Sequence, residues 1–308
     1  MRELIIGARR IADDEKPYII AELGNNHGGS VLTAKDMIIA AARAGADAVK
    51  LQVRQNATLY SQALLDAPYL NENSYGATYG DHRAALELNL NSLRLTQIQA
   101  EQSGIQWFAT AFDERSADRL FNLNVPAIKL ASGALTDVAL QQHVAGFGIP
   151  ILLSTGGGTA ADVDRAVQQI TKRTSRLALL HCTAAYPLEA KDANLRCILT
   201  LRERYPDLVI GYSSHSPGVV LSLIAVAFGA SILEQHFTLN RASKGTDHAF
   251  SLEPKGLETL VEDARKVQQS LGDGVKRWLD IEKGPISKMR RVRTAHGMQI
   301  TGELHAND

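Results

Sequence analysis

The residues of this sequence that could do chemistry stand at the ends of short apolar runs. Among them are two lysines, Lys50 and Lys129, two histidines, His215 and His236, and the carboxylate of Glu22. An ammonium group at the end of a buried strand is costly unless a ligand or a carboxylate neutralises it. We therefore expect these side chains to meet in one polar cavity that binds an anion.

Hydroxyl groups at the ends of other runs add donors for such an anion. They belong to Thr110, Ser132, Ser154 and Ser213. The stretch from Ser154 to Gly158 reads Ser-Thr-Gly-Gly-Gly and precedes an expected helix, so its backbone N–H groups would also suit a phosphate. The alternative is that these glycines only make a strand-to-helix turn.

The two histidines close adjacent runs, and their imidazoles could share a divalent metal with Glu22 or Asp247 as the carboxylate. Two histidines and a carboxylate suit Mn, Fe, Co or Zn and leave positions for water and substrate. A hydrogen-bonded histidine pair without metal is the alternative. His27 and His181 are expected to hold loops instead.

The elements that must position these residues repeat as an apolar run followed by a segment of helical period. This rhythm predicts an α/β fold, a (β/α)8 TIM barrel, whose strand ends converge on one mouth. The expected strands are 18–22, 47–52, 106–110, 127–129, 150–154, 177–181, 208–213 and 231–236. The expected helices are 33–44, 92–103, 114–122, 159–172, 194–205, 218–228 and 254–271, with Ser92 and Thr159 as N-caps.

Three segments lie outside this repeat. Residues 3–11 are predicted to form a short strand pair that plugs the bottom of the barrel. Residues 54–90 form a long irregular insertion with four tyrosines, placed as a functional loop over the mouth. We assign residues 1–272 to the barrel and 273–308 to a basic tail, which either packs on the barrel or a neighbouring subunit or is disordered.

Composition excludes several classes of partner. The 308 residues hold 33 Lys and Arg against 33 Asp and Glu, so no excess charge favours nucleic acid or a membrane surface. No run of 18 apolar residues and no secretory signal occurs, so we expect a cytoplasmic protein that binds small molecules. The two cysteines, Cys182 and Cys197, are expected to be reduced and structural.

Ordered motifs over residues 18–271 resemble the sialic acid (N-acetylneuraminate) synthase family. They are Ala21-Glu-Leu-Gly-Asn-Asn-His-Gly28, Val49-Lys-Leu-Gln52, Phe108-Ala-Thr-Ala-Phe-Asp113, Lys129-Leu-Ala-Ser-Gly133, Leu153-Ser-Thr-Gly156, His181-Cys-Thr183, Tyr186-Pro187, Gly211-Tyr-Ser-Ser-His215, Asp247-His248 and Ser251-Leu-Glu-Pro254. The segment from Asn73 to Glu87 is similar to the lid of that family.

The resemblance implies condensation of phosphoenolpyruvate with the open-chain aldehyde of an amino sugar, giving a 3-deoxy-2-ulosonate and phosphate in a homodimer. It implies that phosphoenolpyruvate is held by Lys50, Thr110, Lys129, Ser132, Ser154 and Ser213. His215 and His236 would bind a divalent metal, Mn2+ first and Mg2+, Co2+ or Zn2+ as alternatives. Glu22 would orient the sugar or move a proton, with Gln52, Tyr186 and Asp247 as hydroxyl contacts.

The sequence departs from the family pattern in three places. Ala134 stands where Glu is usual, and Ala184 stands where a polar residue, often Asn, is common. We also expect a barrel without the antifreeze-like C-terminal domain, whose arginine contacts the acyl-amino sugar; Arg290, Arg291 or Arg293 of the tail could replace it in trans. These departures leave open the same reaction on another aldose, possibly phosphorylated, or a silent relative that only binds the anion.

Overall fold

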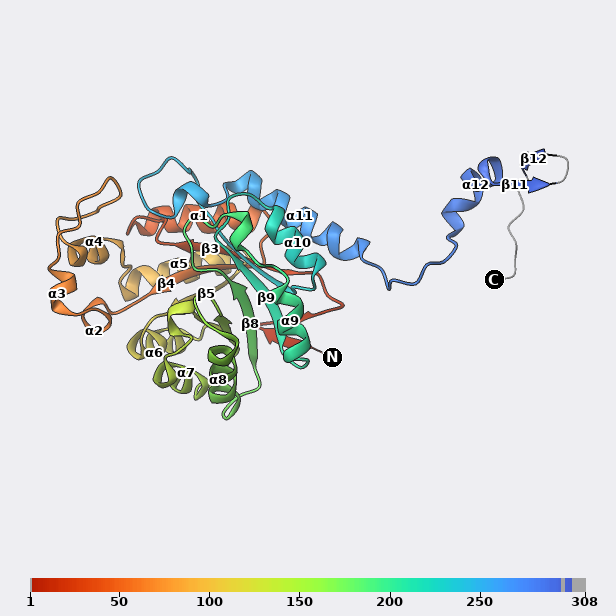
Figure 1. Ribbon diagram of the computed structural model, residues 1–308. Helices are drawn as coiled ribbons and strands as arrows, with labels where there is room; N and C mark the ends of the chain where they lie inside the picture. The colour runs from red at the N-terminus through yellow and green to blue at the C-terminus, as the bar shows by residue number, and fades with distance from the viewer. Residues whose placement is uncertain (1, 295–296, 301–308) are drawn as a thin grey trace. The chain divides into compact units, whose positions relative to one another are not determined.

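Eight parallel strands close into one barrel in the computed structural model, which describes residues 2–294 and 297–300 (Figure 1). Neighbours in the chain pair with each other, and β10 closes the ring onto β3. The predicted (β/α)8 barrel is therefore confirmed, with each strand within two residues of its expected bounds. The strands are β3 (Tyr18–Gly24), β4 (Ala48–Val53), β5 (Gln106–Ala111), β6 (Ile128–Leu130), β7 (Ile151–Ser154), β8 (Leu177–Cys182), β9 (Val209–Ser214) and β10 (Ile232–His236).

Helices surround these strands and bury their outer faces (Figure 1). They are α1 (Val31–Arg43), α5 (Leu90–Gln102), α6 (Glu114–Asn122), α7 (Val138–Ala145), α8 (Ala160–Thr171), α9 (Cys197–Arg204), α10 (Val220–Ala227) and α11 (Pro254–Ser270). The helix α7 was not predicted from the sequence. A polar residue on its buried face interrupts the apolar pattern: Gln141 donates to the carbonyls of Ala134 and Leu135 at 2.8 Å each.

Of the two predicted N-caps, Thr159 is confirmed and Ser92 is wrong. Thr159 caps α8 in a capping box with Asp162, as expected. Ser92 is not a cap, because α5 begins earlier and the side chain of Asn89 accepts from the Ser92 amide at 2.9 Å. Asn is as good a cap as Ser, so residue type alone could not choose between the two positions.

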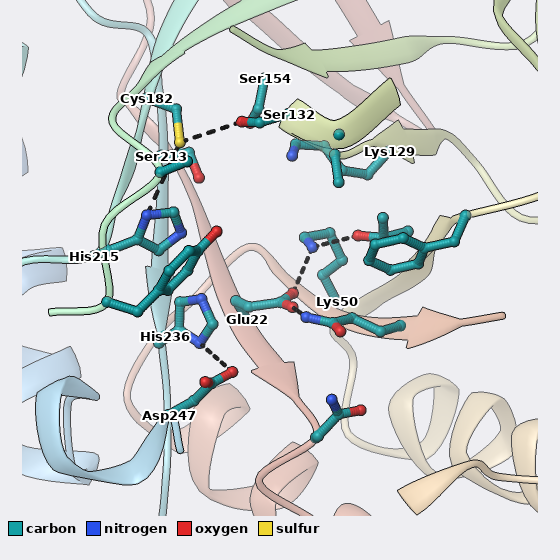
Figure 2. Close-up of a pocket in the computed structure, with 18 of the residues that line it drawn as sticks. Glu22, Lys50, Lys129, Ser132, Ser154, Cys182, Ser213, His215, His236 and Asp247 are labelled. Carbon is teal, nitrogen blue, oxygen red and sulfur yellow. Dashed lines mark hydrogen bonds and ion pairs between the residues drawn. The ribbon is translucent and has the colours of Figure 1, made fainter. Parts of the chain in front are cut away.

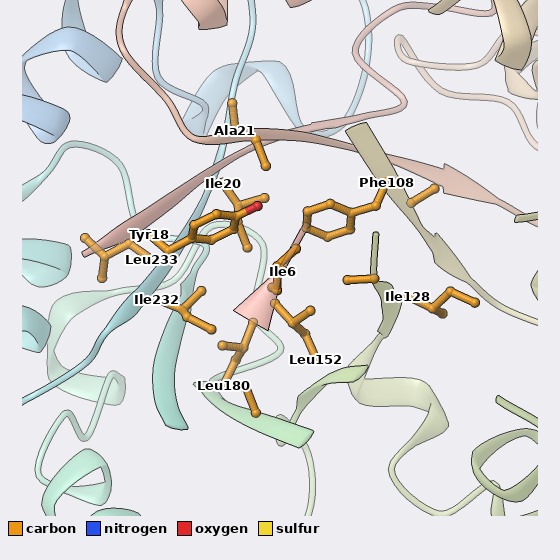
Figure 3. Close-up of a cluster of buried hydrophobic side chains, with 14 of the residues drawn as sticks. Ile6, Tyr18, Ile20, Ala21, Phe108, Ile128, Leu152, Leu180, Ile232 and Leu233 are labelled. Atoms are coloured by element: carbon orange, nitrogen blue, oxygen red, sulfur yellow. The ribbon is translucent and has the colours of Figure 1, made fainter. Parts of the chain in front are cut away.

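The N-terminal segment forms the expected antiparallel pair, β1 (Glu3–Ile6) with β2 (Arg9–Ala12). The Tyr18 hydroxyl donates to Gln106 Oε1 at 2.5 Å, and Gln106 Nε2 donates to the carbonyl of Ile6 at 2.9 Å. Tyr18 and Gln106 begin β3 and β5, so the pair covers the N-terminal end of the barrel. Figure 3 shows Ile6 among side chains of the barrel interior, including Phe108 and Leu180.

The insertion after β4 is ordered, so its prediction as irregular was wrong. It contains α2 (Asn56–Leu59), α3 (Gln62–Leu65) and α4 (Tyr79–Leu86). Its aromatic rings pack together, with Tyr69 and His82 centroids 4.5 Å apart. It is also fixed to the loop after β3, where a Cβ on Gly29 (φ +78°) would lie 2.0 Å from the carbonyl oxygen of Ala85. We call residues 55–89 the lid.

The chain forms two compact units, one ending at Ser270 and one beginning at Leu271. The second holds η4 (Asp280–Glu282), α12 (Lys283–Met289) and an antiparallel pair, β11 (Arg291–Thr294) with β12 (Gly297–Ile300). In it the Arg290 guanidinium lies 5.2 Å from the centre of the Trp278 ring. The side chain of Arg293 is not among those that the structure describes.

Among residues 2–294 and 297–300, no helix has the length and apolar character needed to cross a membrane.

Candidate active site

A cavity of about 510 Å³ opens at the C-terminal ends of the barrel strands (Figure 2). Its volume falls within the ordinary range for small-molecule sites, about 300–1,000 Å³. All twelve residues singled out from the sequence line it: Glu22, Lys50, Gln52, Thr110, Lys129, Ser132, Ser154, Tyr186, Ser213, His215, His236 and Asp247. The barrel thus brings together side chains separated by as many as 225 positions.

Lys50 is held between two neighbouring strands. Its ammonium group lies 2.6 Å from Glu22 Oε2 on β3 and donates to Thr110 Oγ1 on β5 at 2.6 Å. The Glu22 and Lys50 side chains are only 1% and 3% exposed. A buried ammonium needs such a partner, and the Glu22 carboxylate offsets the cost of burying Lys50.

Glu234 on β10 lies between the two lysines. One oxygen is 3.7 Å from Lys50 Nζ and the other 3.7 Å from Lys129 Nζ, and Ser213 donates to it at 2.9 Å. Burial alone would raise the pKa of Glu234, but the two ammonium groups and the Ser213 hydroxyl outweigh burial and hold that pKa at about 2. Burial and repulsion from Lys50 lower the pKa of Lys129, and Glu234 opposes that shift. Glu234 therefore lies within ion-pair distance of two buried cations and opposes the loss of charge at Lys129.

Two of the predicted hydroxyl donors show how the cavity could accept an anion. The Ser154 hydroxyl is buried, and none of the residues that the structure describes forms a hydrogen bond with it. Ser132 Oγ accepts from the Gly156 amide at 3.0 Å and lies 3.5 Å from Cys182 Sγ. An unpaired buried hydroxyl costs free energy unless a ligand completes its hydrogen bonding. The cavity is thus left with donor capacity beside two cations.

The glycine-rich segment does not contribute its backbone as expected. The Gly156 amide is used by Ser132, and Gly157 and Gly158 line a separate cavity of about 350 Å³ beside α8 and α9. A Cβ on Gly158 would lie 2.1 Å from Leu135 Cδ2. Packing between neighbouring segments, and not a phosphate cradle, accounts for glycine at that position.

The two histidines lie across the cavity from the lysines, with ring centroids 5.3 Å apart (Figure 2). Burial and the neighbouring His236 ring lower the pKa of His215 to about 4, so its imidazole is neutral near pH 7. His215 Nδ1 lies 3.0 Å from the Thr183 carbonyl, which assigns the proton to Nδ1 and leaves the Nε2 lone pair free. His236 Nδ1 is buried 3.6 Å from Asp247 Oδ2 and forms no hydrogen bond within residues 2–294 and 297–300.

This donor set fits a divalent cation with an incomplete protein shell. Two imidazoles with available lone pairs and one carboxylate are ligands that Mn2+, Co2+ or Zn2+ accept. Within the part of the chain that the structure describes, no three His, Cys, Asp or Glu side chains are already arranged as a ligand set. Water and substrate would therefore supply the remaining ligands.

The residues expected to contact a sugar lie around the same cavity. Gln52 Nε2 donates to Glu22 Oε1 at 2.8 Å. The Tyr186 ring lies 4.1 Å from that of His215 and is 56% exposed, so it forms part of the opening. Asp247 lies toward the cavity from the turn after β10. Carboxylate, amide and phenol groups at an opening are suited to sugar hydroxyls.

Several lining residues escaped the sequence analysis. Glu234 was given no role, although it stands two residues before His236 and so faces the same side of β10. Arg54 likewise continues the spacing of Lys50 and Gln52. Cys182, expected to be only structural, lines the cavity. Arg83 and Tyr60 reach it from the lid, and no local pattern marks that contact. Ala184 also lines the cavity, whereas Ala134 is buried and is not part of the lining.

Comparison with known proteins places the chain among sugar-acid synthases. The sequence matches the NeuB family over residues 37–276. N-acetylneuraminate-9-phosphate synthase of Drosophila melanogaster is 41% identical over 79% of this chain and 66% of that protein. N,N'-diacetyllegionaminic acid synthase of Legionella pneumophila is 35% identical over 93% and 83%. The structure of N-acetylneuraminic acid (sialic acid) synthetase from Leptospira borgpetersenii, in complex with citrate, has a TM-score of 0.80 at 33% identity, over 92% of this chain and 95% of that one.

Proposed function

Because the chain belongs to the NeuB family, we propose that it condenses phosphoenolpyruvate with the open-chain aldehyde of an amino sugar. The products would be a sialic-acid-like 3-deoxy-2-ulosonate and inorganic phosphate. The observation that carries this proposal is the convergence of Lys50, Lys129 and the unpaired Ser154 hydroxyl in one buried cavity. Two cations and free donors are what the phosphate and carboxylate of phosphoenolpyruvate require.

In the proposed reaction, Lys50 and Lys129 neutralise the phosphate and carboxylate of phosphoenolpyruvate. Thr110, Ser132, Ser154 and Ser213 donate hydrogen bonds to the same oxygens. Lys50 would exchange part of its contact with Glu22 for the substrate, a rearrangement that costs little because the ammonium stays paired throughout. Fixed donors around charge that develops during a reaction are an effective form of transition-state stabilisation.

The bond changes balance with water as the third reactant. The methylene carbon of phosphoenolpyruvate attacks the aldehyde carbon, and the new carbon–carbon bond leaves positive charge at the carbon that carries the phosphate. Water adds there, and the carbon–oxygen bond to phosphate then breaks. The carboxylates of Glu22, Glu234 and Asp247 line the cavity, and Glu234 already lies between the two lysines. Glu22 or Asp247 would take the proton from the water, and the alkoxide formed from the aldehyde oxygen would gain one, so that the proton count balances.

We propose His215 and His236, with Asp247 nearby, as the residues that hold a divalent cation, Mn2+ first. When bound, the cation would supply Lewis acidity for the aldehyde oxygen. Gln52, Tyr186 and Asp247 would bind sugar hydroxyls. The lid would exclude bulk water, so that hydrolysis does not compete with carbon–carbon bond formation.

The test uses purified protein with phosphoenolpyruvate, Mn2+ and a panel of aldoses, measuring phosphate release and the ulosonate product. We expect release that depends on an amino-sugar aldehyde, falls on chelation with EDTA, and is lost in Lys129→Met. The surface variant Lys255→Met, on α11 at 82% side-chain exposure, is the matched control. Phosphoenolpyruvate binding without release for any aldehyde would contradict the proposal and favour a silent anion-binding relative.

Three further properties complete the proposal. We propose a homodimer, a cytoplasmic location, and a contribution of Arg290 or Arg291 to a neighbour's sugar site. Sedimentation equilibrium tests the first, and fractionation of the source cells tests the second. Mixing Arg290→Gln/Arg291→Gln subunits with Lys129→Met subunits tests the third, because only a shared site would recover activity in mixed dimers.

A further inference from the structure

The turn after β3 carries a buried amide to which the proposed reaction gives no role. It belongs to Asn26, in the Asn-Asn-His stretch of residues 25–27. Asn26 is 6% exposed and is not among the described residues that line the cavity. A buried amide is costly unless its N–H groups are hydrogen-bonded. Both N–H groups of Asn26 are used, and they lead to two different parts of the candidate active site.

One N–H group of Asn26 holds the end of β10. Asn26 Nδ2 donates to the carbonyl of Phe237 at 2.9 Å, and Phe237 directly follows His236. On the other side of this backbone, the His236 carbonyl accepts from the Leu252 amide at 2.8 Å. A carbonyl oxygen only accepts hydrogen bonds, so the contact with Phe237 requires a donor at position 26. The backbone that carries His236 is therefore fixed from two sides.

The second N–H group of Asn26 holds the turn that carries Asp247. Asn26 Nδ2 also donates to Ser251 Oγ at 3.0 Å, and the Ser251 hydroxyl donates to the carbonyl of Asp247 at 2.6 Å. Ser251 is 2% exposed, so bulk water has little access to these bonds. Two hydrogen bonds in series thus connect Asn26 to the backbone of Asp247.

The side chains of His236 and Asp247 do not hold each other in place. They face each other in the cavity (Figure 2), with His236 Nδ1 3.6 Å from Asp247 Oδ2. This distance is longer than a hydrogen bond. The separation of the two side chains is therefore set by their backbones, and Asn26 is bonded to both of these backbones.

We infer that Asn26 is a positioning residue, which holds His236 and Asp247 where both can contact one divalent cation. This inference rests on the proposed function, because it takes these two side chains as part of the proposed cation site. Ligands that are already fixed lose less conformational freedom when they bind. Outer groups that orient metal ligands in this way contribute about 10- to 100-fold to metal affinity.

The substitution Asn26→Asp tests the inference with little change in size. The new carboxylate still accepts from the Ser251 hydroxyl, but it places an acceptor against the Phe237 carbonyl. Electron paramagnetic resonance of free Mn2+ measures the affinity for the cation without turnover. The affinity of Asn26→Asp for Mn2+ should be about 10- to 100-fold lower than that of wild type.

Binding of phosphoenolpyruvate in the presence of EDTA distinguishes positioning from a general loss of structure. Calorimetry should show that Asn26→Asp changes this affinity by less than about threefold. The reason is that the ammonium groups of Lys50 and Lys129 are held by other carboxylates, those of Glu22 and Glu234.

Gln106→Glu is the matched control at the opposite end of the barrel. Gln106 Nε2 also donates to a backbone carbonyl, that of Ile6, at 2.9 Å, and Gln106 Oε1 accepts from the Tyr18 hydroxyl. This variant should lose stability and keep its Mn2+ affinity within about threefold of wild type. Ser251→Ala is a smaller second change, which breaks only the connection to Asp247. It should lower the Mn2+ affinity by about tenfold.

Unchanged Mn2+ affinity in Asn26→Asp or in Ser251→Ala would overturn the inference. So would a loss of phosphoenolpyruvate affinity as large as the loss of Mn2+ affinity, an equal loss of Mn2+ affinity in Gln106→Glu, or a wild type that binds no Mn2+. If Asn26→Asp does not fold, Ser251→Ala decides. The proposed synthase activity fails separately: when wild type binds Mn2+ but turns over no aldehyde, the role of Asn26 stands if Asn26→Asp still loses Mn2+ affinity.

Discussion

Replacing Glu234 with Gln should change how many protons accompany phosphoenolpyruvate binding. Glu234 lies 3.7 Å from Lys129 Nζ, and both side chains are at most 6% exposed. At an effective dielectric constant of about 20, one unit charge at that distance contributes about 4 kcal/mol. That amount changes the ratio of charged to neutral amine about a thousandfold. Glu234→Gln keeps the size and the acceptor for Ser213, but it removes this attraction.

Burial and Lys50 already lower the pKa of Lys129 and Glu234 opposes that shift, so we expect the pKa of Lys129 to fall further in the variant. The trianionic ligand would then favour the charged amine, and binding at about pH 8 should take up more protons than in wild type. Affinity for phosphoenolpyruvate should fall at least about tenfold at that pH and recover as the pH decreases.

Calorimetry in two buffers of different ionisation enthalpy measures this proton uptake directly. Glu258→Gln is the matched control, because Glu258 pairs with Lys255 at 2.7 Å on the surface, where the pair is solvated. It should leave both affinity and proton uptake unchanged. Equal proton uptake and equal affinity in wild type and Glu234→Gln would refute the assignment of Glu234 as the group that opposes deprotonation of Lys129.

Three further predictions concern stability and are checked by urea unfolding. Gly211→Ala should destabilise by about 3 kcal/mol or more, because its Cβ would lie 2.4 Å from Leu180 Cδ2 and 2.7 Å from the Ile232 carbonyl oxygen; an unchanged midpoint would be inconsistent with this packing. Asn89→Ala should cost about 1 kcal/mol and Ser92→Ala clearly less, since Asn89 is the cap of α5; the reverse order would restore Ser92 as the cap. Burial raises the pKa of Glu87 from 4.5 to about 6. The protonated Glu87 side chain therefore adds to the free energy of unfolding below about pH 4.5, and this contribution is lost as the pH rises through about 6. Relative to wild type, the free energy of unfolding of Glu87→Gln should therefore rise by about 2 kcal/mol between about pH 4 and about pH 7. A difference between the two proteins that does not change with pH would argue against the raised pKa of Glu87.

The barrel could be predicted because each strand carries a local signal that does not depend on its partners. Buried parallel strands read as apolar runs, and their ends identify which residues share the mouth. Lys50, Lys129 and the two histidines were found in this way. The short helix α7 escaped because Gln141 bonds two backbone carbonyls on its buried face, which only the folded chain can show.

Pairing between distant residues was also hidden from the sequence. Glu234 acts on lysines of β4 and β6, and Arg83 reaches the cavity only because the lid folds back over it. The insertion was predicted as irregular because its helices are short and its aromatic contacts have no fixed spacing. The glycines after Ser154 matched a phosphate-binding pattern. Position 158 is instead restricted to glycine because the Leu135 side chain leaves no room for a Cβ. The residue types indicated that the site binds an anion. Contacts between residues far apart in the sequence determined which side chains and backbone groups are able to contact a ligand.

A crystal structure with phosphoenolpyruvate and Mn2+ tests the central claim most directly. We predict one phosphoenolpyruvate within hydrogen-bond distance of both Lys50 Nζ and Lys129 Nζ, with the Ser154 hydroxyl donating to it. Anomalous scattering should place Mn2+ between His215 and His236. Phosphoenolpyruvate bound away from either lysine, or Mn2+ bound only at residues outside this cavity, would contradict the account.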